Sequence, residues 1–165
     1  MSETVHATAV LAGAHGLLIR GPSGAGKSML AAQLIRRGAW LVADDRVHLS
    51  ACHGRLIASA PAPAAGRLEL RGRGILLVPH EQGAVIRLVI DLVEVADLER
   101  LPDDAQMCGE ILGITLPRQA VPAASGAALV LVEAAIQALS AAQYGLAVSA
   151  GLGMMAALPM DMATS

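Results

Sequence analysis

The chain has 165 residues, 33 of them alanine, and a formal net charge of −2. A near-neutral chain of this size suffices for one compact domain and lacks the basic excess of a nucleic-acid-binding surface. One tryptophan, one tyrosine and no phenylalanine leave few aromatic rings on which nucleobases could stack, so nucleic acid is not an expected partner.

No stretch of the sequence has the features of a secretion signal or a membrane span. Two cysteines, Cys52 and Cys108, are too few for a disulfide framework, and the N-terminal residues lack a basic stretch followed by an apolar one. The uncharged segment 134–160 is interrupted by glycine, glutamine and proline, whereas a spanning helix needs about 20 consecutive, mainly apolar residues. We therefore expect a cytoplasmic protein that binds no membrane.

The first half of the chain alternates apolar strands with a helix. Strands are predicted from short apolar runs bounded by turn residues, over 4–11, 15–20 and 39–43. Between the last two, leucines four residues apart predict a helix over 28–37, which Gly38 closes. A hairpin is expected where 46–50 and 55–60 flank a short turn.

The second half is less regular. Segment 67–79 alternates and then becomes apolar, 85–95 predicts a long strand, and 96–113 is polar enough to predict loops. A core helix is expected over 126–145. Together these elements predict an α/β fold with a mixed or largely parallel sheet and flanking helices. We expect a single domain over 1–165, its core at about 4–145 and a C-terminal tail over 146–165.

The segment GPSGAGKS (21–28) matches the phosphate-binding P-loop pattern G-x-x-x-x-G-K-[ST]. Glycines let the loop curl until its backbone N–H groups point at phosphate oxygens, and the following helix start favours anions. Lys27 would contact the β- and γ-phosphates, and the Ser28 hydroxyl would serve Mg²⁺. The expected ATP-binding residues are Gly21, Ser23, Gly24, Ala25, Gly26, Lys27 and Ser28.

Lys27 is the only lysine in a chain that has eleven arginines. The composition has therefore shifted from lysine to arginine everywhere except in the P-loop. The planar guanidinium of arginine does not replace a compact ammonium inside a phosphate cradle. This exception strengthens the interpretation of the loop as a nucleotide site.

Two acidic residues, Asp44 and Asp45, end the predicted strand that follows the helix. Ligands of open α/β sheets bind outside the carboxyl ends of the strands, and carboxylates there can hold Mg²⁺. Neighbours in an extended strand point to opposite sides, so both can reach a nucleotide only if the strand has just ended. A solvated turn at the strand end is the alternative.

Taken together, these segments resemble a known family. The matching pieces are His6, GPSGAGKS, the helix end IRRG, LVADDRV (41–47), LELRGRGILLV (68–78) and ILGITLPRQAVP (111–122). They are similar, over about 5–145, to the catalytic domain of bacterial HPr kinase/phosphorylase, whose P-loop kinase core is related to phosphoenolpyruvate carboxykinase. The chain looks like the short alphaproteobacterial forms, which lack the separate N-terminal domain.

The resemblance implies a role for each matching side chain. Asp44 matches the acid/base that takes the proton of the attacking serine, and His6 matches a histidine beside that aspartate. Arg100 matches a loop arginine that neutralises charge on the transferred phosphoryl group. The implied metal ligands are Ser28, Asp45 and Glu69.

The implied function is ATP-dependent phosphorylation of a serine in HPr, the phosphocarrier of the sugar phosphotransferase system, by a Mg²⁺-requiring enzyme that forms homo-oligomers, in this family hexamers. Two alternatives remain open: a P-loop kinase of small molecules, and a regulator that binds ATP without catalysis. An acid/base at the acceptor position argues against the second, because a pure sensor does not need one.

The reverse reaction of the family, removal of the phosphate by inorganic phosphate with release of pyrophosphate, is expected to be weak or absent. Ala-Ala-Ser-Gly (123–126) stands where the family commonly has Pro-Gly-Arg-Asn, and the loop 101–110 is short. The missing arginine belongs to the dephosphorylation side of the reaction. The purified protein should therefore phosphorylate HPr from ATP yet release little pyrophosphate from phosphorylated HPr and inorganic phosphate; robust pyrophosphate production would contradict this prediction.

Overall fold

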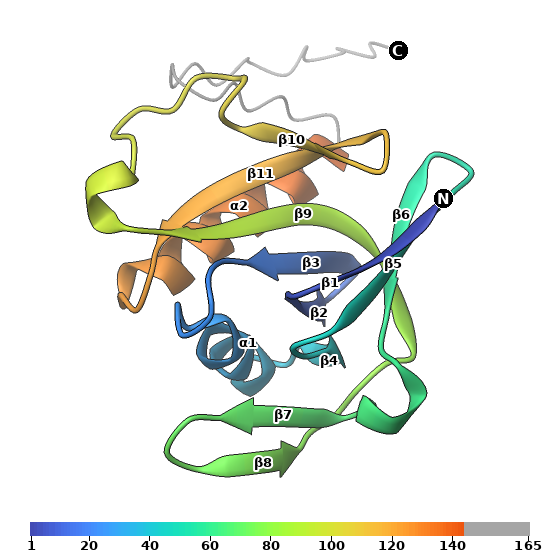
Figure 1. Ribbon diagram of the computed structural model, residues 1–165. Coiled ribbons are helices and arrows are strands. Elements are labelled where there is room, and N and C mark those ends of the chain that lie inside the picture. Colours follow the sequence, from blue (N-terminus) through green and yellow to red (C-terminus); the bar gives the residue numbers. More distant parts are fainter. Residues whose placement is uncertain (144–165) are drawn as a thin grey trace, which may run out of the picture.

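The computed structural model describes residues 1–143, so the predicted tail and the last residues of the predicted C-terminal helix lie outside the described residues. Within this part, a nine-stranded mixed sheet curls around the molecule, accompanied by a separate two-stranded hairpin and two α-helices (Figure 1). Neither helix in residues 1–143 is long and apolar enough to cross a lipid bilayer. The mixed α/β fold confirms the predicted fold class.

The described residues form eleven strands and two α-helices, whose bounds are as follows. The strands of the first half are β1 (Ser2–Val5), β2 (Thr8–Ala12), β3 (His15–Arg20), β4 (Trp40–Ala43), β5 (Val47–Cys52) and β6 (Arg55–Ser59). The strands of the second half are β7 (Arg67–Leu70), β8 (Gly74–Leu77), β9 (Gly83–Val93), β10 (Cys108–Ile111) and β11 (Ile114–Pro122). The helices are α1 (Lys27–Arg36) and α2 (Ala127–Gln143).

Three parallel strands form the centre of the sheet. β9 pairs in parallel with β3 on one side and with β11 on the other, whereas the remaining pairs are antiparallel. The order runs β1-β5-β6-β9-β3-β2-β4, with β11 and β10 branching from β9. The P-loop follows the carboxyl end of β3, where ligands bind in parallel sheets.

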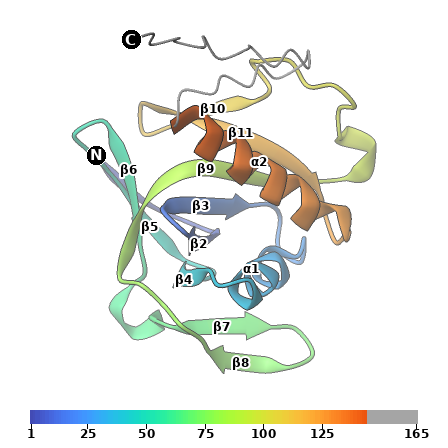
Figure 2. The same ribbon diagram turned by 180° about the vertical axis from the view of Figure 1, so that it is seen from behind.

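Both helices pack on the same face of the sheet, as Figure 2 shows from behind. Leu30 and Leu34 of α1 and Val132 of α2 join one buried cluster with the inward side chains of β3 and β9. A second buried cluster fills the other face, where the curled sheet packs against itself without a helix. The helix α1 ends as predicted, because Gly38 has the left-handed φ of +96° that closes it.

The structure defines segment 67–79, for which no particular element was predicted, and corrects the expectation for segment 96–113. Segment 67–79 forms a tight hairpin of β7 and β8, which turns where Gly72 and Gly74 have positive φ values. Segment 96–113 is a loop only up to residue 107, because β10 pairs with β11. The local pattern of these strands is weak, because apolar residues such as Ile75 and Leu77 of β8 stay exposed and do not mark a buried face.

A partly buried carboxylate joins the three central strands. Asp91 of β9 accepts two hydrogen bonds from Arg20 at the end of β3, at 2.8 and 2.9 Å, and a short one of 2.5 Å from Arg118 of β11. Arg118 also donates to the backbone oxygen of Gln106, 2.9 Å away. The residue before the P-loop and the loop that contains Arg100 are thereby tied to one carboxylate.

The ion pairs of Asp91 with Arg20 and Arg118 should make the free energy of unfolding depend on pH. Burial disfavours the charged carboxylate, but hydrogen bonds and charges of Arg20 and Arg118 outweigh it and lower the pKa of Asp91. A lowered folded-state pKa stabilises the fold above the usual aspartate range, and this stabilisation is lost as the pH falls through the lowered pKa. Asp91→Asn should therefore reduce the free energy of unfolding by about 2 kcal/mol at neutral pH.

Denaturant titrations at about pH 7 and about pH 3 would check this prediction. The difference between wild type and Asp91→Asn should shrink at the lower pH. The matched control is Asp97→Asn, because Asp97 is exposed and forms no ion pair within residues 1–143. An equal loss in both variants, or a loss independent of pH, would contradict the prediction.

Candidate active site

The P-loop forms a turn between β3 and α1 that only glycine-rich sequence can adopt. Gly24 and Gly26 have φ values of +80° and +101°, which L side chains rarely adopt. Gly26 is the N-cap residue of α1, and no side chain caps this helix start. Its first N–H groups therefore remain available to an anion.

Two residues of the predicted ATP site, Gly21 and Ala25, face the protein interior rather than the cavity. A Cβ at Gly21 would lie 2.9 Å from Cβ of Leu92, so only glycine allows the loop to pass this close to β9. Ala25 is buried in the cluster beneath the loop. Neither residue lines the cavity described next, whereas the other five predicted loop residues, Ser23, Gly24, Gly26, Lys27 and Ser28, do.

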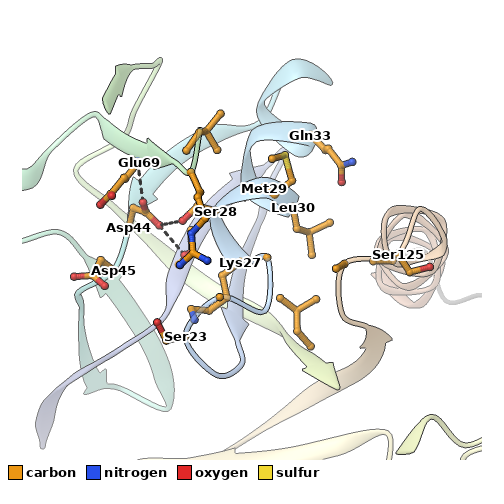
Figure 3. Close-up of a pocket in the computed structure, with 18 of the residues that line it drawn as sticks. Ser23, Lys27, Ser28, Met29, Leu30, Gln33, Asp44, Asp45, Glu69 and Ser125 are labelled. Carbon is orange, nitrogen blue, oxygen red and sulfur yellow. Dashed lines mark hydrogen bonds between the residues drawn. The ribbon is translucent and has the colours of Figure 1, made fainter. Parts of the chain in front are cut away.

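A cavity of about 570 Å³ opens in front of the loop. Figure 3 shows the acidic side chains on one side of it, Ser125 on the other and Lys27 between them. His6, Asp44, Asp45 and Glu69 also line it, so most of the predicted catalytic and metal residues meet here. The lining residues come from six separate regions of the chain, which explains why motif spacing alone could not place them together.

Lys27 is held inside the loop. Only 7% of its surface is exposed, and Nζ donates to the carbonyl oxygens of Gly21 and Pro22 at 2.9 and 3.0 Å. Burial lowers the pKa of Lys27, and the charges of Asp44 and Asp45 partly oppose this shift. The ammonium is therefore fixed by the loop and balanced by the aspartate pair rather than by one direct ion pair.

Asp44 is the most tightly held acidic group of the site. Its Oδ1 accepts hydrogen bonds from the hydroxyls of Thr8 and Ser28, each 2.8 Å long, and Oδ2 accepts one of 3.1 Å from the backbone N–H of Glu69. The carboxylate is 9% exposed. Asp44 thus joins β2, the P-loop helix and the β7–β8 hairpin, with one oxygen still able to accept a further bond.

Asp45 lies beside it in a different environment. The strand β4 ends at Ala43, and Asp45 has a left-handed φ of +66°. This turn lets both carboxylates reach the cavity. It meets the condition stated for the pair, that both can reach a nucleotide only if the strand has just ended. His6 contacts Asp45, with Nε2 2.9 Å from Oδ1, and not Asp44 as the family resemblance implied. Both partners of this pair are exposed.

Thr8 and Ser125 are cavity residues that sequence reasoning missed, and Arg71, from the segment LELRGRGILLV (68–78), lines the cavity as well. Thr8 is fully buried and orients Asp44. Ser125 lies in the turn before α2, and Arg71 lies in the turn after β7, 3.8 Å from where a Cβ of Gly24 would be. No local motif marks Thr8 or Ser125, because each enters the site only through the packing of its element.

The oxygen donors of the cavity suit Mg²⁺, which takes oxygen ligands and usually keeps several waters while bound by one or two carboxylates and substrate phosphates. Ser28, Asp45 and Glu69 all line the cavity. Within residues 1–143, no three His, Cys, Asp or Glu side chains converge as a metal site formed by the protein alone. The residues therefore fit a metal that phosphates help to hold.

Arg100 lies away from this cavity. It lines a separate cavity of about 400 Å³, together with Asp97, Pro102 and Arg118. The structure thus gathers His6, Asp44, Asp45 and Glu69 around the P-loop and leaves Arg100 outside. Its role in catalysis stays a prediction.

A strand–loop–helix cradle with an aspartate bound to its serine defines the chain as a P-loop protein. The model of the family "HPr Serine kinase C-terminal domain" matches residues 1–154. The chain therefore belongs to this family.

Solved and curated relatives agree with this assignment. The chain is 38% identical over 131 residues to an HPr kinase/phosphorylase of Clostridium tetani, covering 73% of this chain and 43% of that protein. It is 40% identical over 149 residues to one of Geobacillus thermodenitrificans, covering 81% and 47%. It thus spans less than half the length of these relatives.

One solved structure has the same fold. The Hpr(Ser) kinase/phosphatase of Coxiella burnetii superposes with a TM-score of 0.76 at 30% identity, covering 87% of this chain and 93% of that one. This likeness confirms the mixed α/β architecture expected from the family resemblance.

Replacement of the single lysine by arginine should not preserve nucleotide binding. The loop encloses Lys27 with two backbone carbonyls, and a longer, planar guanidinium cannot occupy the same position. Lys27→Arg should weaken the affinity for an ATP analogue by at least about tenfold, measured by calorimetric titration. Arg36→Lys, an exchange of the same two side chains at an exposed position of α1, should leave it unchanged. Equal affinities in both variants would contradict a phosphate-binding role for Lys27.

Proposed function

We propose that this chain is an ATP-dependent protein-serine kinase that phosphorylates HPr. The observation that carries the proposal is the cavity that places the P-loop lysine and serine beside the Asp44–Asp45 pair. The names of the relatives, HPr kinase/phosphorylase and Hpr(Ser) kinase/phosphatase, support HPr as the acceptor. A regulator that only binds ATP would not require a carboxylate fixed by three hydrogen bonds next to the phosphate loop.

The P-loop would hold the triphosphate of ATP. Backbone N–H groups at the start of α1 favour its negative charge, and Lys27 can turn from the carbonyls of Gly21 and Pro22 toward the phosphates. Phosphoryl transfer passes through a loose transition state, so positioning and charge neutralisation dominate catalysis. The loop would supply both the positioning and the charge neutralisation.

Asp44 would receive the proton of the acceptor serine. As the serine oxygen bonds to the γ-phosphorus and the bond to ADP breaks, the hydroxyl proton moves to Oδ2, the oxygen with only one hydrogen bond. Thr8, Ser28 and the backbone of Glu69 fix the direction of this carboxylate. His6 would act through Asp45, which it contacts, and not directly on Asp44.

Ser28, Asp45 and Glu69 would hold Mg²⁺ together with the phosphates. When bound, the metal would neutralise part of the negative charge of the phosphates. The hydrogen bond from Ser28 to Asp44 links the metal side of the site to the acceptor side.

The remaining parts of the proposal concern the whole protein. Residues 1–165 would act as one catalytic domain, assembled as a homo-oligomer, with hexamers expected from the family. A cytoplasmic location fits the need for ATP and two cysteines, Cys52 and Cys108, which stay reduced there.

Transfer of phosphate from ATP to HPr tests the proposal, with the acceptor present and absent. Asp44→Asn should lower the rate of HPr phosphorylation by about 100-fold or more and change the affinity for an ATP analogue by less than about threefold, because the amide cannot accept the proton. Asp97→Asn serves as the matched control and should retain full activity. ATP binding without any phosphorylation of HPr by the wild type would refute the kinase and favour the regulator.

The variant Asp45→Asn distinguishes the proposed roles of the two aspartates. If Asp45 holds the metal, this variant should need a higher Mg²⁺ concentration for half-maximal activity, whereas Asp44→Asn should not be rescued by metal. The opposite pattern would exchange the two roles and leave the kinase itself in place.

A further inference from the structure

The turn between β7 and β8 carries an arginine into the cavity of the P-loop. Arg71 is the first residue after β7, and the backbone N–H of Arg73 donates to the carbonyl oxygen of Leu70 at 2.9 Å. Gly72, between the two arginines, has a φ of +86°, as the third residue of a type II turn requires. Of the two arginines in this tight turn, Arg71 lines the cavity and Arg73 does not.

The strand that leads to Arg71 is anchored at three consecutive residues. Leu68 is 1% exposed and belongs to the buried cluster on which α1 packs. The backbone N–H of Glu69 donates to Oδ2 of Asp44 at 3.1 Å. Leu70 packs against the same cluster and lines the cavity. Arg71 therefore follows directly on a segment fixed to the core and to the proposed proton acceptor.

The guanidinium of Arg71 lies against the P-loop. A Cβ built on Gly24 would lie 3.8 Å from Nη1 and 3.9 Å from Nη2, so the charged end of the side chain faces the loop. Backbone N–H groups of such a loop cradle phosphates, and its lysine reaches the β- and γ-phosphates. A guanidinium beside the loop is therefore close to the phosphates that the loop would hold.

The charge of Arg71 is not neutralised within the part of the chain that the structure describes. Among residues 1–143, Arg71 forms no ion pair with a carboxylate, although Arg20, Arg37 and Arg118 each do. The side chain is exposed in the cavity, where an anionic ligand can reach it. Its forked N–H donors therefore remain available to that ligand.

The acceptor side of the cavity requires such a cation. Three carboxylates, of which Asp44 is the proposed proton acceptor, lie on this side (Figure 3), where they repel an incoming phosphoryl group. Arg100 lines a separate cavity. Within residues 1–143, Arg71 is thus the arginine that lines the cavity of the P-loop.

We propose that Arg71 is a catalytic residue that binds the γ-phosphoryl group of ATP and neutralises its charge during transfer. The inference rests on the proposed kinase function. As the serine oxygen bonds to the γ-phosphorus and the bond to ADP breaks, the serine proton goes to Asp44. Arg71 keeps its own protons and donates hydrogen bonds to the non-bridging oxygens, which its planar fork matches in pairs.

The difference in affinity between a triphosphate and a diphosphate tests this contact. Calorimetric titrations of the full chain with Mg²⁺ would use a non-hydrolysable ATP analogue and ADP as probes. Arg71→Gln should weaken binding of the analogue by about tenfold and of ADP by less than about twofold, because only the γ-phosphate loses charge-assisted hydrogen bonds. Arg73→Gln, the same exchange in the same turn but outside the cavity, should change neither affinity.

Turnover gives the second measurement. At saturating ATP and HPr, Arg71→Gln should lower kcat for HPr phosphorylation by about 1000-fold, the effect typical of an arginine on a transferred phosphoryl group. Arg71→Lys, which keeps the charge without the fork, should recover part of this loss. Arg73→Gln should retain the wild-type kcat. Equal weakening of the analogue and of ADP in Arg71→Gln, or an unchanged kcat, would overturn the proposal. The same losses in Arg100→Gln, with none in Arg71→Gln, would assign the role to Arg100 instead.

The nucleotide titrations keep this inference separate from the proposed function. If the wild type bound the ATP analogue yet phosphorylated no HPr, the proposed acceptor would be wrong. A selective loss of analogue affinity in Arg71→Gln would still show the contact with the γ-phosphate. HPr phosphorylation that Arg71→Gln does not slow would leave the kinase in place and remove Arg71 from its mechanism.

Discussion

The parallel pairing of β3 with β9 is the constraint on which the rest of the structure depends. Gly16 lets the two backbones approach, because a Cβ there would lie 2.3 Å from the carbonyl oxygen of Val85. Arg20 and Asp91 join the far ends of the same strands by two hydrogen bonds. Gly21 then passes against Leu92. The P-loop therefore leaves the sheet from a position fixed at three successive points.

Charge in the site is balanced over several groups. Lys27 sits in a cradle of backbone carbonyls with two aspartates nearby, and burial is the main influence on its pKa. Asp44 is held by neutral donors, whereas Asp45 is exposed beside His6. Adjacent carboxylates with such different surroundings can take different tasks in phosphoryl transfer. Their different surroundings follow from the turn after β4, where Asp45 takes a left-handed φ.

Much of the local structure could be predicted from sequence. The P-loop, the helix α1 with its closing Gly38, and the β5–β6 hairpin follow from turn residues and short-range periodicity, which act within a few residues. The β7–β8 and β10–β11 hairpins did not, because the turn glycines Gly72 and Gly113 were not interpreted as hairpin signals, and the parallel pairing of β11 with β9 is long-range. Family resemblance brought His6 and Glu69 into the candidate site, where no local spacing would have placed them.

The sequence by itself determined the phosphate loop, its single lysine and the aspartate pair, because a glycine-rich turn before a helix needs particular residues at particular places. Only the tertiary structure decided that Thr8 orients Asp44, that His6 contacts Asp45, and that Arg100 lies outside the cavity. It also placed the guanidinium of Arg71 against the P-loop. These contacts depend on strand register and on how the sheet curls, which are settled by packing between residues far apart in the chain.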